Sequence, residues 1–141
     1  MNKALLMTET LIRVRFSDVD SMGVVWHGKY IKYFEDGRED FGKKFGIGYL
    51  DFFNNGILVP VVKLDCSFKK PLRFGDTALV ETRFIDSDAA KTIFEYVIYN
   101  EKTREIVASG STTQVFMDLK HKLLLNFPAF FLEWKNQLGL G

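Results

Sequence analysis

The sequence predicts one α+β domain in which a curved antiparallel sheet wraps around a single long helix. Three observations carry this prediction: strand-like alternation near the N-terminus, helical spacing after it, and strand-like alternation again through most of the remaining chain. The 141 residues suffice for one domain with one core. Because no repeat and no linker rich in Pro, Gly or Ser divides them, we expect a single domain over residues 1–141.

The first expected element is a strand over residues 8–16. Apolar and polar residues alternate there, and the segment is rich in the branched and aromatic side chains that favour strands. Residues 17–23 read Ser-Asp-Val-Asp-Ser-Met-Gly, a composition typical of a turn. We therefore expect the strand to end in a polar turn that leads into the helix.

The second expected element is a long amphipathic helix that begins near His27 or Gly28. Its apolar positions recur at steps of three or four residues: Tyr30, Phe34, Gly37, Phe41 and Phe45. The pattern predicts four to five turns ending at Gly46 or Gly48. Glycine costs about 1 kcal/mol of helix propensity relative to alanine, so Gly37 on the apolar stripe indicates a close approach of helix and sheet.

From Ile57 onward the apolar residues follow the period of two that strands require. The clearest runs are Val80, Thr82 and Phe84, then Phe94, Tyr96 and Ile98, then residues 106–117. The polar connections at 86–88 and 100–102 suit hairpin turns, so we expect five to six antiparallel strands. Asn126 is expected to cap a short C-terminal helix with Pro128 in its first turn. Its apolar stripe would continue through Phe131, Trp134 and Leu138.

Composition limits the possible function classes. The chain is 47% hydrophobic and 26% charged, which is typical of a soluble globular protein. Its net charge of +1 provides no global field for nucleic acid or an anionic membrane. No run approaches the ~18 apolar residues that cross a bilayer, and the apolar run 4–7 is too short for a signal peptide. We expect a cytoplasmic protein that binds neither nucleic acid nor membranes.

Cysteine and histidine usage predicts neither a disulfide nor a metal site. Cys66 is the only cysteine of the sequence, so no disulfide can form within the chain, which fits a reducing compartment. His27 and His121 fall in different expected elements and belong to no ligand cluster. We therefore expect no metal and no cofactor.

Residues 15–30 are the most informative segment of the sequence. From Asp18 to Tyr30 they read Asp-x-Asp-x-x-Gly-Val-Val-aromatic-His-x-x-Tyr, and residues 71–76 read Pro-Leu-Arg-Phe-Gly-Asp. Both patterns resemble signatures of the 4-hydroxybenzoyl-CoA thioesterase-like family of the hotdog superfamily, and the element order agrees from about residue 8 to 118. The resemblance implies a hotdog fold and hydrolysis of an acyl-CoA, or a related acyl thioester, to free acid and thiol.

The resemblance places the catalytic carboxylate at Asp20 and not at Asp18, whose surroundings indicate a turn or capping role. An ionised aspartate suits either a nucleophile or a general base. The implied oxyanion donor is the backbone amide of His27 at the helix N-terminus, and the imidazole could orient substrate or assist the leaving thiolate. Phe16 stands where several relatives carry tyrosine, so a role that needs that hydroxyl is absent or moved.

The remaining expected contacts surround this segment and a basic turn. The residues expected to contact the thioester are Gly23, Val24, Val25, Trp26, Gly28 and Tyr30. Tyr30 also fits a position in the core. The residues expected to contact the CoA phosphates are Lys69, Lys70 and Arg73. In the resembling family the site commonly lies between subunits, which implies a homodimer, with a tetramer also possible. An exposed edge strand, which pairing would protect, agrees with this.

Four alternatives stay open at this point. Glu35, Asp36 and Glu39 match a second hotdog lineage whose catalytic carboxylate lies on the central helix. Hotdog enoyl-CoA hydratases or dehydratases also combine an acid with a histidine, but at a tighter spacing than Asp20 and His27 have. The others are an acyl-carrier-protein thioesterase and a non-catalytic acyl-CoA-binding protein. The 14 phenylalanines predict an aromatic core or an apolar pocket without fixing the acyl group.

Overall fold

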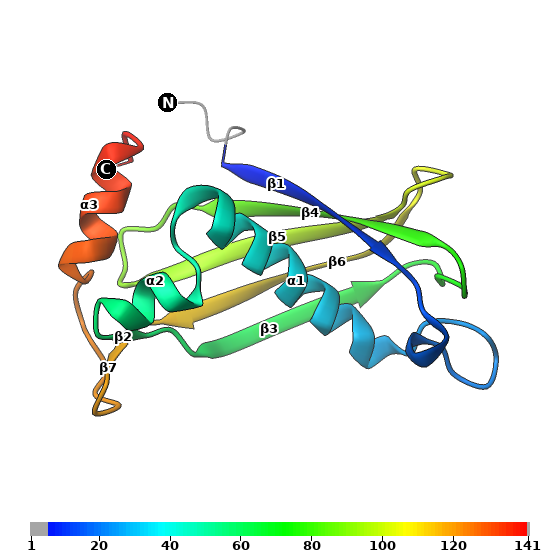
Figure 1. Cartoon of the computed structure of the whole chain (residues 1–141), viewed down its shortest axis with the longest axis horizontal. Helices are drawn as coiled ribbons and strands as arrows, with labels where there is room; N and C mark the ends of the chain where they lie inside the picture. The colour runs from blue at the N-terminus through cyan, green and yellow to red at the C-terminus, as the bar shows by residue number, and fades with distance from the viewer. Residues whose placement is uncertain (1–5, 141) are drawn as a thin grey trace.

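A five-stranded antiparallel sheet wraps around one long helix in the computed structural model, which describes residues 6–140 (Figure 1). The elements in chain order are β1 (Met7–Arg13), η2 (Phe16–Asp18), α1 (His27–Phe45), α2 (Tyr49–Asn54), β2 (Ile57–Leu58), β3 (Val61–Phe68), β4 (Thr77–Ile85), β5 (Lys91–Asn100), β6 (Ile106–Val115), β7 (Met117–Asp118) and α3 (Ala129–Gln137). This arrangement confirms the predicted fold class.

The strand order of the main sheet is β1-β4-β5-β6-β3, and every pair in it is antiparallel. Strands β4, β5 and β6 follow one another along the chain and occupy the middle, whereas β1 and β3 form the two edges. Strands β2 and β7 form a separate two-stranded sheet. Figure 1 shows β3 along an open border of the sheet, at the opposite edge from β1.

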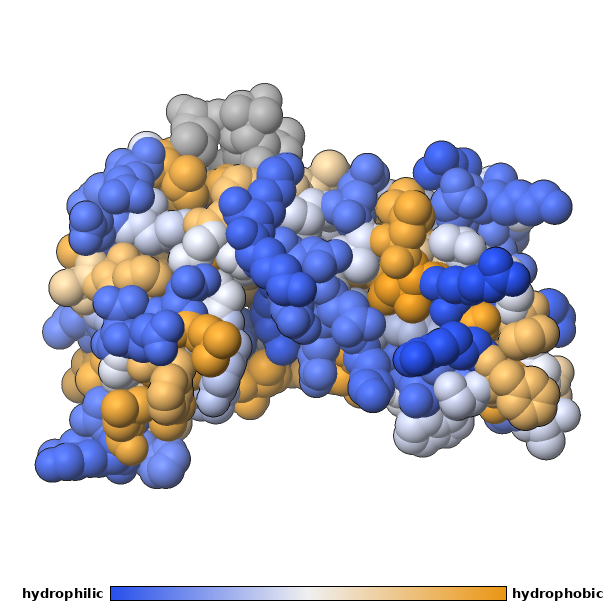
Figure 2. Space-filling view, viewed as in Figure 1, coloured by the Kyte–Doolittle hydropathy of each residue, from blue (hydrophilic) through white to orange (hydrophobic). Residues whose placement is uncertain are grey.

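Helix α1 buries the predicted apolar stripe against the concave face of the sheet, and Figure 2 shows hydrophilic residues along the outer side of the helix. The Phe34 ring stacks on Tyr96 of β5 with ring centroids 4.4 Å apart, and Phe41 packs against Phe84 and Phe94. The helix starts at His27 and ends at the left-handed cap Gly46, as the sequence predicts. Within residues 6–140, no helix combines the length and the apolar character needed to cross a membrane.

At Gly37, α1 lies close against strand β4 of the sheet. A Cβ added there would overlap the hydroxyl of Thr82 in β4 and would lie 3.0 Å from Cγ1 of Val80. The predicted close approach of helix and sheet is therefore confirmed. The Thr82 hydroxyl is buried and has no hydrogen-bond partner among the described residues.

Three parts of the fold differ from the sequence-based expectations. Strand β1 ends at Arg13, not at residue 16, because Phe16–Asp18 close into a 3-10 turn through the Asp18 amide and the Arg15 carbonyl. Helix α3 starts at Ala129 with Pro128 at its N-cap, so the cap expected at Asn126 is wrong. Helix α2 and strands β2 and β7 were not expected, because two to six residues are too short for a periodic signal.

Seven of the 14 phenylalanines form much of the core, and helix α3 closes one end of it. The seven buried rings are Phe34, Phe41, Phe52, Phe84, Phe94, Phe116 and Phe131. Trp134 of α3 packs on Phe84 and donates a hydrogen bond to the Phe45 carbonyl at 2.7 Å. The buried Lys135 holds α3 to the β4–β5 connection by an ion pair with Asp86 at 2.8 Å. The expected aromatic core is therefore confirmed.

We expect Gly37→Val to destabilise the fold by about 2 kcal/mol or more, because overpacking a tight contact costs about 1–3 kcal/mol and valine also disfavours helix. Urea unfolding measures the effect. Lys32→Val, at an exposed position of α1, is the matched control and should cost about 0.5 kcal/mol. Thr82→Ala should reduce the cost of Gly37→Val by removing the overlapping hydroxyl. Equal stability of the Gly37 and Lys32 variants would contradict the close approach.

Candidate active site

Asp20 lies in a tight turn between η2 and α1. The Asp20 amide donates a hydrogen bond to the Val24 carbonyl at 2.8 Å, and the Gly23 amide donates to the Asp20 carbonyl at 2.9 Å. Gly23 has φ +76°, in the left-handed region that glycine enters without strain. The Asp-x-x-Gly part of the motif is therefore explained by the backbone of the turn.

The Asp20 carboxylate is half-buried, and only one of its oxygens is held. Oδ1 accepts hydrogen bonds from the Met22 amide at 2.8 Å and the Val24 amide at 3.4 Å. Oδ2 has no hydrogen-bond donor among the residues that the structure describes. Asp118 makes the same local pattern with the amides of Lys120 and Lys122, so this pattern alone indicates only a turn.

The start of α1 distinguishes the Asp20 turn from the Asp118 turn. Trp26 occupies the N-cap without a side-chain cap, and the first helical turn contains no acidic residue. The Trp26 amide donates to the Asp18 carbonyl, and the Lys29 amide donates to the Trp26 carbonyl, both at 2.9 Å. Within residues 6–140 the amides of His27 and Gly28 have no acceptor. Two free amides at the positive end of a 19-residue helix can bind an anion or an oxyanion.

Asp18 lies just before this site and is 3% exposed. Its Oδ2 accepts hydrogen bonds from the Arg15 amide and the Tyr33 hydroxyl, both at 3.0 Å, and Lys29 Nζ lies 3.8 Å from its Oδ1. Burial, and next the negative charge of Asp18, raise the pKa of Tyr33 far above its ordinary value. These contacts agree with a capping role for Asp18, as expected from its surroundings.

The segment after β3 forms one wall of the site. The Val25 amide donates to the Leu72 carbonyl at 2.8 Å, and the Leu72 amide donates to the Tyr30 hydroxyl at 3.4 Å. Burial raises the pKa of Tyr30. Val25 and Tyr30 are both buried, so they support the site from the core. Phe68, which sequence reasoning missed, lies at right angles to the His27 ring with centroids 6.2 Å apart.

Exposed aromatic side chains surround the start of α1. Trp26 is 51% exposed, its ring lies over Gly28, and its centroid is 5.0 Å from that of the exposed His27. Phe16 and Phe74, both well exposed, meet edge to face at 6.0 Å. Clusters of this kind offer apolar contact area close to the free amides.

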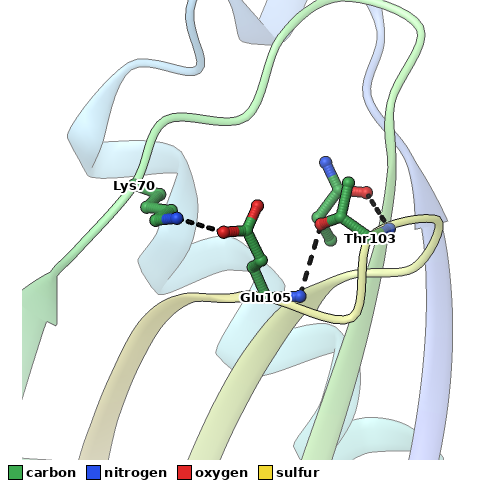
Figure 3. Close-up of polar contacts among 4 residues, drawn as sticks. Lys70, Thr103 and Glu105 are labelled. Atoms are coloured by element: carbon green, nitrogen blue, oxygen red, sulfur yellow. Dashed lines mark hydrogen bonds and ion pairs between the residues drawn. The ribbon is translucent and has the colours of Figure 1, made fainter.

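The three expected phosphate contacts are all exposed, but they are not equivalent. Lys70 forms an ion pair with Glu105 in the β5–β6 connection (Figure 3). The backbone amide of Glu105 donates a hydrogen bond to the Thr103 hydroxyl at 3.3 Å. The hydrogen bond from Lys70 is the main cause of the lowered pKa of Glu105. Among the described residues, Lys69 and Arg73 form no ion pair. Their cationic groups are therefore the better placed for a phosphate.

A cavity of about 540 Å³ lies elsewhere, between α1, α2 and the β5–β6 part of the sheet. Glu35 and Glu39 of the alternative carboxylate set line it, whereas Asp36, Asp20 and His27 do not. Partial desolvation and the nearby Glu39 raise the pKa of Asp36. Glu35 follows His27 by eight residues, which is about 12 Å along a helix. Within one chain, the cavity is therefore separate from the Asp20 turn.

The expected site residues divide among the Asp20 turn, the start of α1 and the segment that follows β3. Asp20, Gly23 and Val24 share the turn, and Trp26, His27 and Gly28 share the helix start that follows it. Val25 and Tyr30 lie beneath them, and Lys69, Lys70 and Arg73 lie on the adjoining wall segment. Across residues 6–140, no three His, Cys, Asp or Glu side chains are grouped closely enough to hold a metal ion.

Comparisons with known proteins identify the family. The profile of the thioesterase-like superfamily matches residues 14–135. A candidate acyl-CoA thioesterase of Bacillus subtilis is 35% identical over 123 residues, covering 87% of this chain and 88% of that protein. A 1,4-dihydroxy-2-naphthoyl-CoA hydrolase of Thermosynechococcus vestitus is 29% identical, covering 86% and 83%. The crystal structure of a DHNA-CoA thioesterase from Staphylococcus aureus superposes with a TM-score of 0.83 at 28% identity, covering 94% and 91%. The chain belongs to the thioesterase-like superfamily and has its hotdog fold.

Proposed function

We propose that this thioester hydrolase cleaves an acyl-CoA, or a closely related acyl thioester, to a free acid and a thiol at Asp20. One observation carries the proposal: residues 20–28 contain a carboxylate with one oxygen, and two helix amides, that have no hydrogen-bond partner among residues 6–140. Thioester hydrolysis needs both a group that attacks or activates water and donors for the developing oxyanion. The names of the relatives, which refer to CoA thioesters, support the substrate class.

The start of α1 would polarise the thioester carbonyl. An oxygen placed there would accept hydrogen bonds from the amides of His27 and Gly28, which point out of the helix without competing acceptors in the described chain. These bonds strengthen as negative charge develops on the oxygen, and the helix dipole adds to them. Losing one such donor typically costs about 3–4 kcal/mol of transition-state stabilisation.

Asp20 can act in either of two ways, and both end in the same products. As a nucleophile, Oδ2 attacks the carbonyl carbon, the carbon–sulfur bond breaks, and water then hydrolyses the resulting anhydride. As a general base, Oδ2 takes a proton from a water molecule while that water attacks the carbonyl carbon, and the tetrahedral intermediate then breaks its carbon–sulfur bond and releases the thiolate, which takes up a proton. The Met22 amide, bonded to Oδ1, would keep the carboxylate oriented in both cases.

The side chains around Asp20 would bind the rest of the substrate. The exposed His27 imidazole, beside Trp26 and Phe68, is placed to orient the thioester or to assist the leaving thiolate. Lys69 and Arg73 would bind CoA phosphates, and Lys70 would do so only on leaving Glu105. An acyl-carrier protein, the alternative carrier, would present the same thioester to the same groups.

Glu35 is the second candidate for the reacting carboxylate, because it lines the cavity. Its position in the middle of α1 argues against it, since amides inside a helix already bond to carbonyls and cannot serve as oxyanion donors. The free amides are at the first turn of α1, next to Asp20. We therefore assign Glu35 to the acyl-binding region and Asp20 to the reaction.

We also propose a homodimer formed by two copies of β3. This edge strand has eight residues, pairs on one side with β6 alone, and exposes the apolar side chains of Val61, Val62, Leu64 and Phe68. Long apolar edges of this kind invite pairing with another strand. Twofold symmetry would make the two strands antiparallel, so the Phe68 end of one would lie beside the Val61 end of the other.

This pairing would join the two halves of a site. Phe68 contacts His27 at one end of β3, whereas Val61 lines the cavity at the other end. The cavity of one protomer would therefore lie near the start of α1 in its partner, where it could take the acyl group. A tetramer would consist of two such dimers.

We expect Asp20→Asn to lower kcat at least about 100-fold, because the amide can neither attack the thioester nor take a proton from water. Thiol release from short, medium, long and aromatic acyl-CoAs, and from an acyl-carrier-protein thioester, measures it. Asp118→Asn is the matched control, since Asp118 makes the same turn bonds away from the helix start, and it should leave kcat unchanged. Glu35→Gln should alter KM and acyl preference more than kcat.

Two results would oppose the assignment. If Asp20→Asn has the kcat of wild type while Glu35→Gln loses activity, Glu35 and not Asp20 would be the reacting carboxylate. If wild type hydrolyses none of the thioesters, hydration or binding would be left as the function.

The thiol of Cys66 should interfere little with an assay that detects released thiol by a chromogenic reagent. Burial raises the pKa of Cys66, so this thiol should react slowly with the reagent at neutral pH, and a blank without substrate corrects for it.

We expect wild type to have about twice the 16.3 kDa mass of one chain in light scattering after size exclusion. Leu64→Glu should lower that mass and the activity together, because it places like charges where the two β3 strands meet. Leu11→Glu, a similar change on the exposed β1 edge, is the control and should leave the dimer intact. A monomeric wild type, or dissociation by Leu11→Glu alone, would refute pairing through β3.

A further inference from the structure

The buried carboxylate of Asp18 is a charged group that the proposed reaction does not use. Acidic side chains are rarely this buried unless they are paired. Its partners belong to two segments: the backbone amide of Arg15 precedes the 3-10 turn, and the side chains of Lys29 and Tyr33 come from the first two turns of α1. These two segments flank the Asp20 turn in the sequence.

The backbone of Asp18 acts on the same region. Its carbonyl accepts a hydrogen bond from the Trp26 amide at 2.9 Å. Trp26 directly precedes His27 and Gly28 in the sequence. The next two amides, of His27 and Gly28, are those without acceptors in the described chain. Asp18 therefore sits where the chain entering the Asp20 turn meets the chain that leaves it.

We propose that Asp18 is a positioning residue that sets the distance between the Asp20 carboxylate and the free amides of His27 and Gly28. The inference rests on the proposed function, because it concerns the same reaction centre. Asp18 acts through Tyr33 and Lys29, which fix the first two turns of α1, and through Arg15, which fixes the entry to the turn. It touches neither the substrate nor the reacting atoms.

A positioning role has a kinetic consequence that a structural role lacks. If α1 shifts relative to the Asp20 turn, the carbonyl can no longer meet the oxyanion donors and the carboxylate together, and small misplacements cost large factors in rate. Contacts that bind the acyl group and the CoA moiety lie elsewhere and are unaffected. The loss should therefore fall on kcat, with KM little changed.

The test compares Asp18→Ala, Asp18→Asn, Tyr33→Phe and wild type in the thioesterase assay and in amide hydrogen exchange. We expect Asp18→Ala to lower kcat at least about tenfold with KM within about threefold. Asp18→Asn, which keeps one acceptor oxygen, should recover part of that rate. Exchange at residues 29–33, whose amides are hydrogen-bonded, should be at least about tenfold faster in Asp18→Ala, with β4 and β5 unchanged.

Asp86→Ala is the matched control for loss of a buried ion pair. It removes the carboxylate partner of Lys135 at the α3 end of the molecule, so it should lower stability and leave kcat unchanged. A folded Asp18→Ala with kcat within twofold of wild type, or a kcat loss equalled by Asp86→Ala, would overturn the proposal. If Asp18→Ala does not fold, Tyr33→Phe decides: unchanged kcat and unchanged exchange at residues 29–33 would overturn the proposal.

Failure of the proposed function gives a different result. Wild type without thioesterase activity would refute the assigned reaction, while hydrogen exchange would still report whether Asp18 holds the start of α1. Unaltered exchange in folded Asp18→Ala would refute the positioning role even in an active enzyme.

Discussion

The packing of α1 against the concave face of the sheet is the constraint on which the rest of the molecule depends. Its apolar side carries several of the largest buried side chains, and Gly37 lets the helix axis come close to β4. Core packing fixes the line of the helix against the sheet, and the contacts of Asp18 with Lys29 and Tyr33 lie at its first two turns. The position of the His27 and Gly28 amides therefore depends on both.

The proposed chemistry depends on the absence of a capping side chain at the start of this helix. Most helices begin with a Ser, Thr, Asp or Asn cap, and replacing such a cap typically costs about 1 kcal/mol. Here Trp26 holds that position without a capping side chain, which leaves two amides for a substrate oxygen. The polar contacts that stabilise this region are made by the buried carboxylate of Asp18 and not by a cap at the helix start. In the proposed mechanism, stability and reactivity are thus assigned to two aspartates two residues apart.

The sequence predicted those parts of the fold that repeat a local pattern over many residues. Helix α1 and strands β4, β5 and β6 have long periodic segments, and Gly37 was correctly explained by its place on an apolar stripe. The strand expected over residues 8–16 extends three residues beyond the end of β1, because the alternation of apolar and polar residues continues into the 3-10 turn at Phe16. Helix α2 and strands β2 and β7 are too short to have a measurable period.

The candidate site was predictable to a similar extent. The Asp20 turn and the helix start are contiguous in sequence, so a motif could locate them. Phe68 on His27 and Tyr33 on Asp18 are contacts between separate elements, joined only by folding. The cavity likewise combines α1, α2 and three strands. The signals available in the sequence were His27 at an uncapped helix start and Tyr33 on the buried side of the same helix. Neither signal identifies the residue that the side chain contacts.

The most direct test of the central claim is a crystal structure with an acyl-CoA analogue in which a methylene group separates the sulfur from the carbonyl carbon. Such a ketone keeps the carbonyl but cannot be hydrolysed. The account predicts its oxygen within hydrogen-bond distance, about 3 Å, of the His27 amide, with Asp20 Oδ2 facing the carbonyl carbon directly or through one water. A carbonyl bound against Glu35 or Glu39, away from the first turn of α1, would contradict the account.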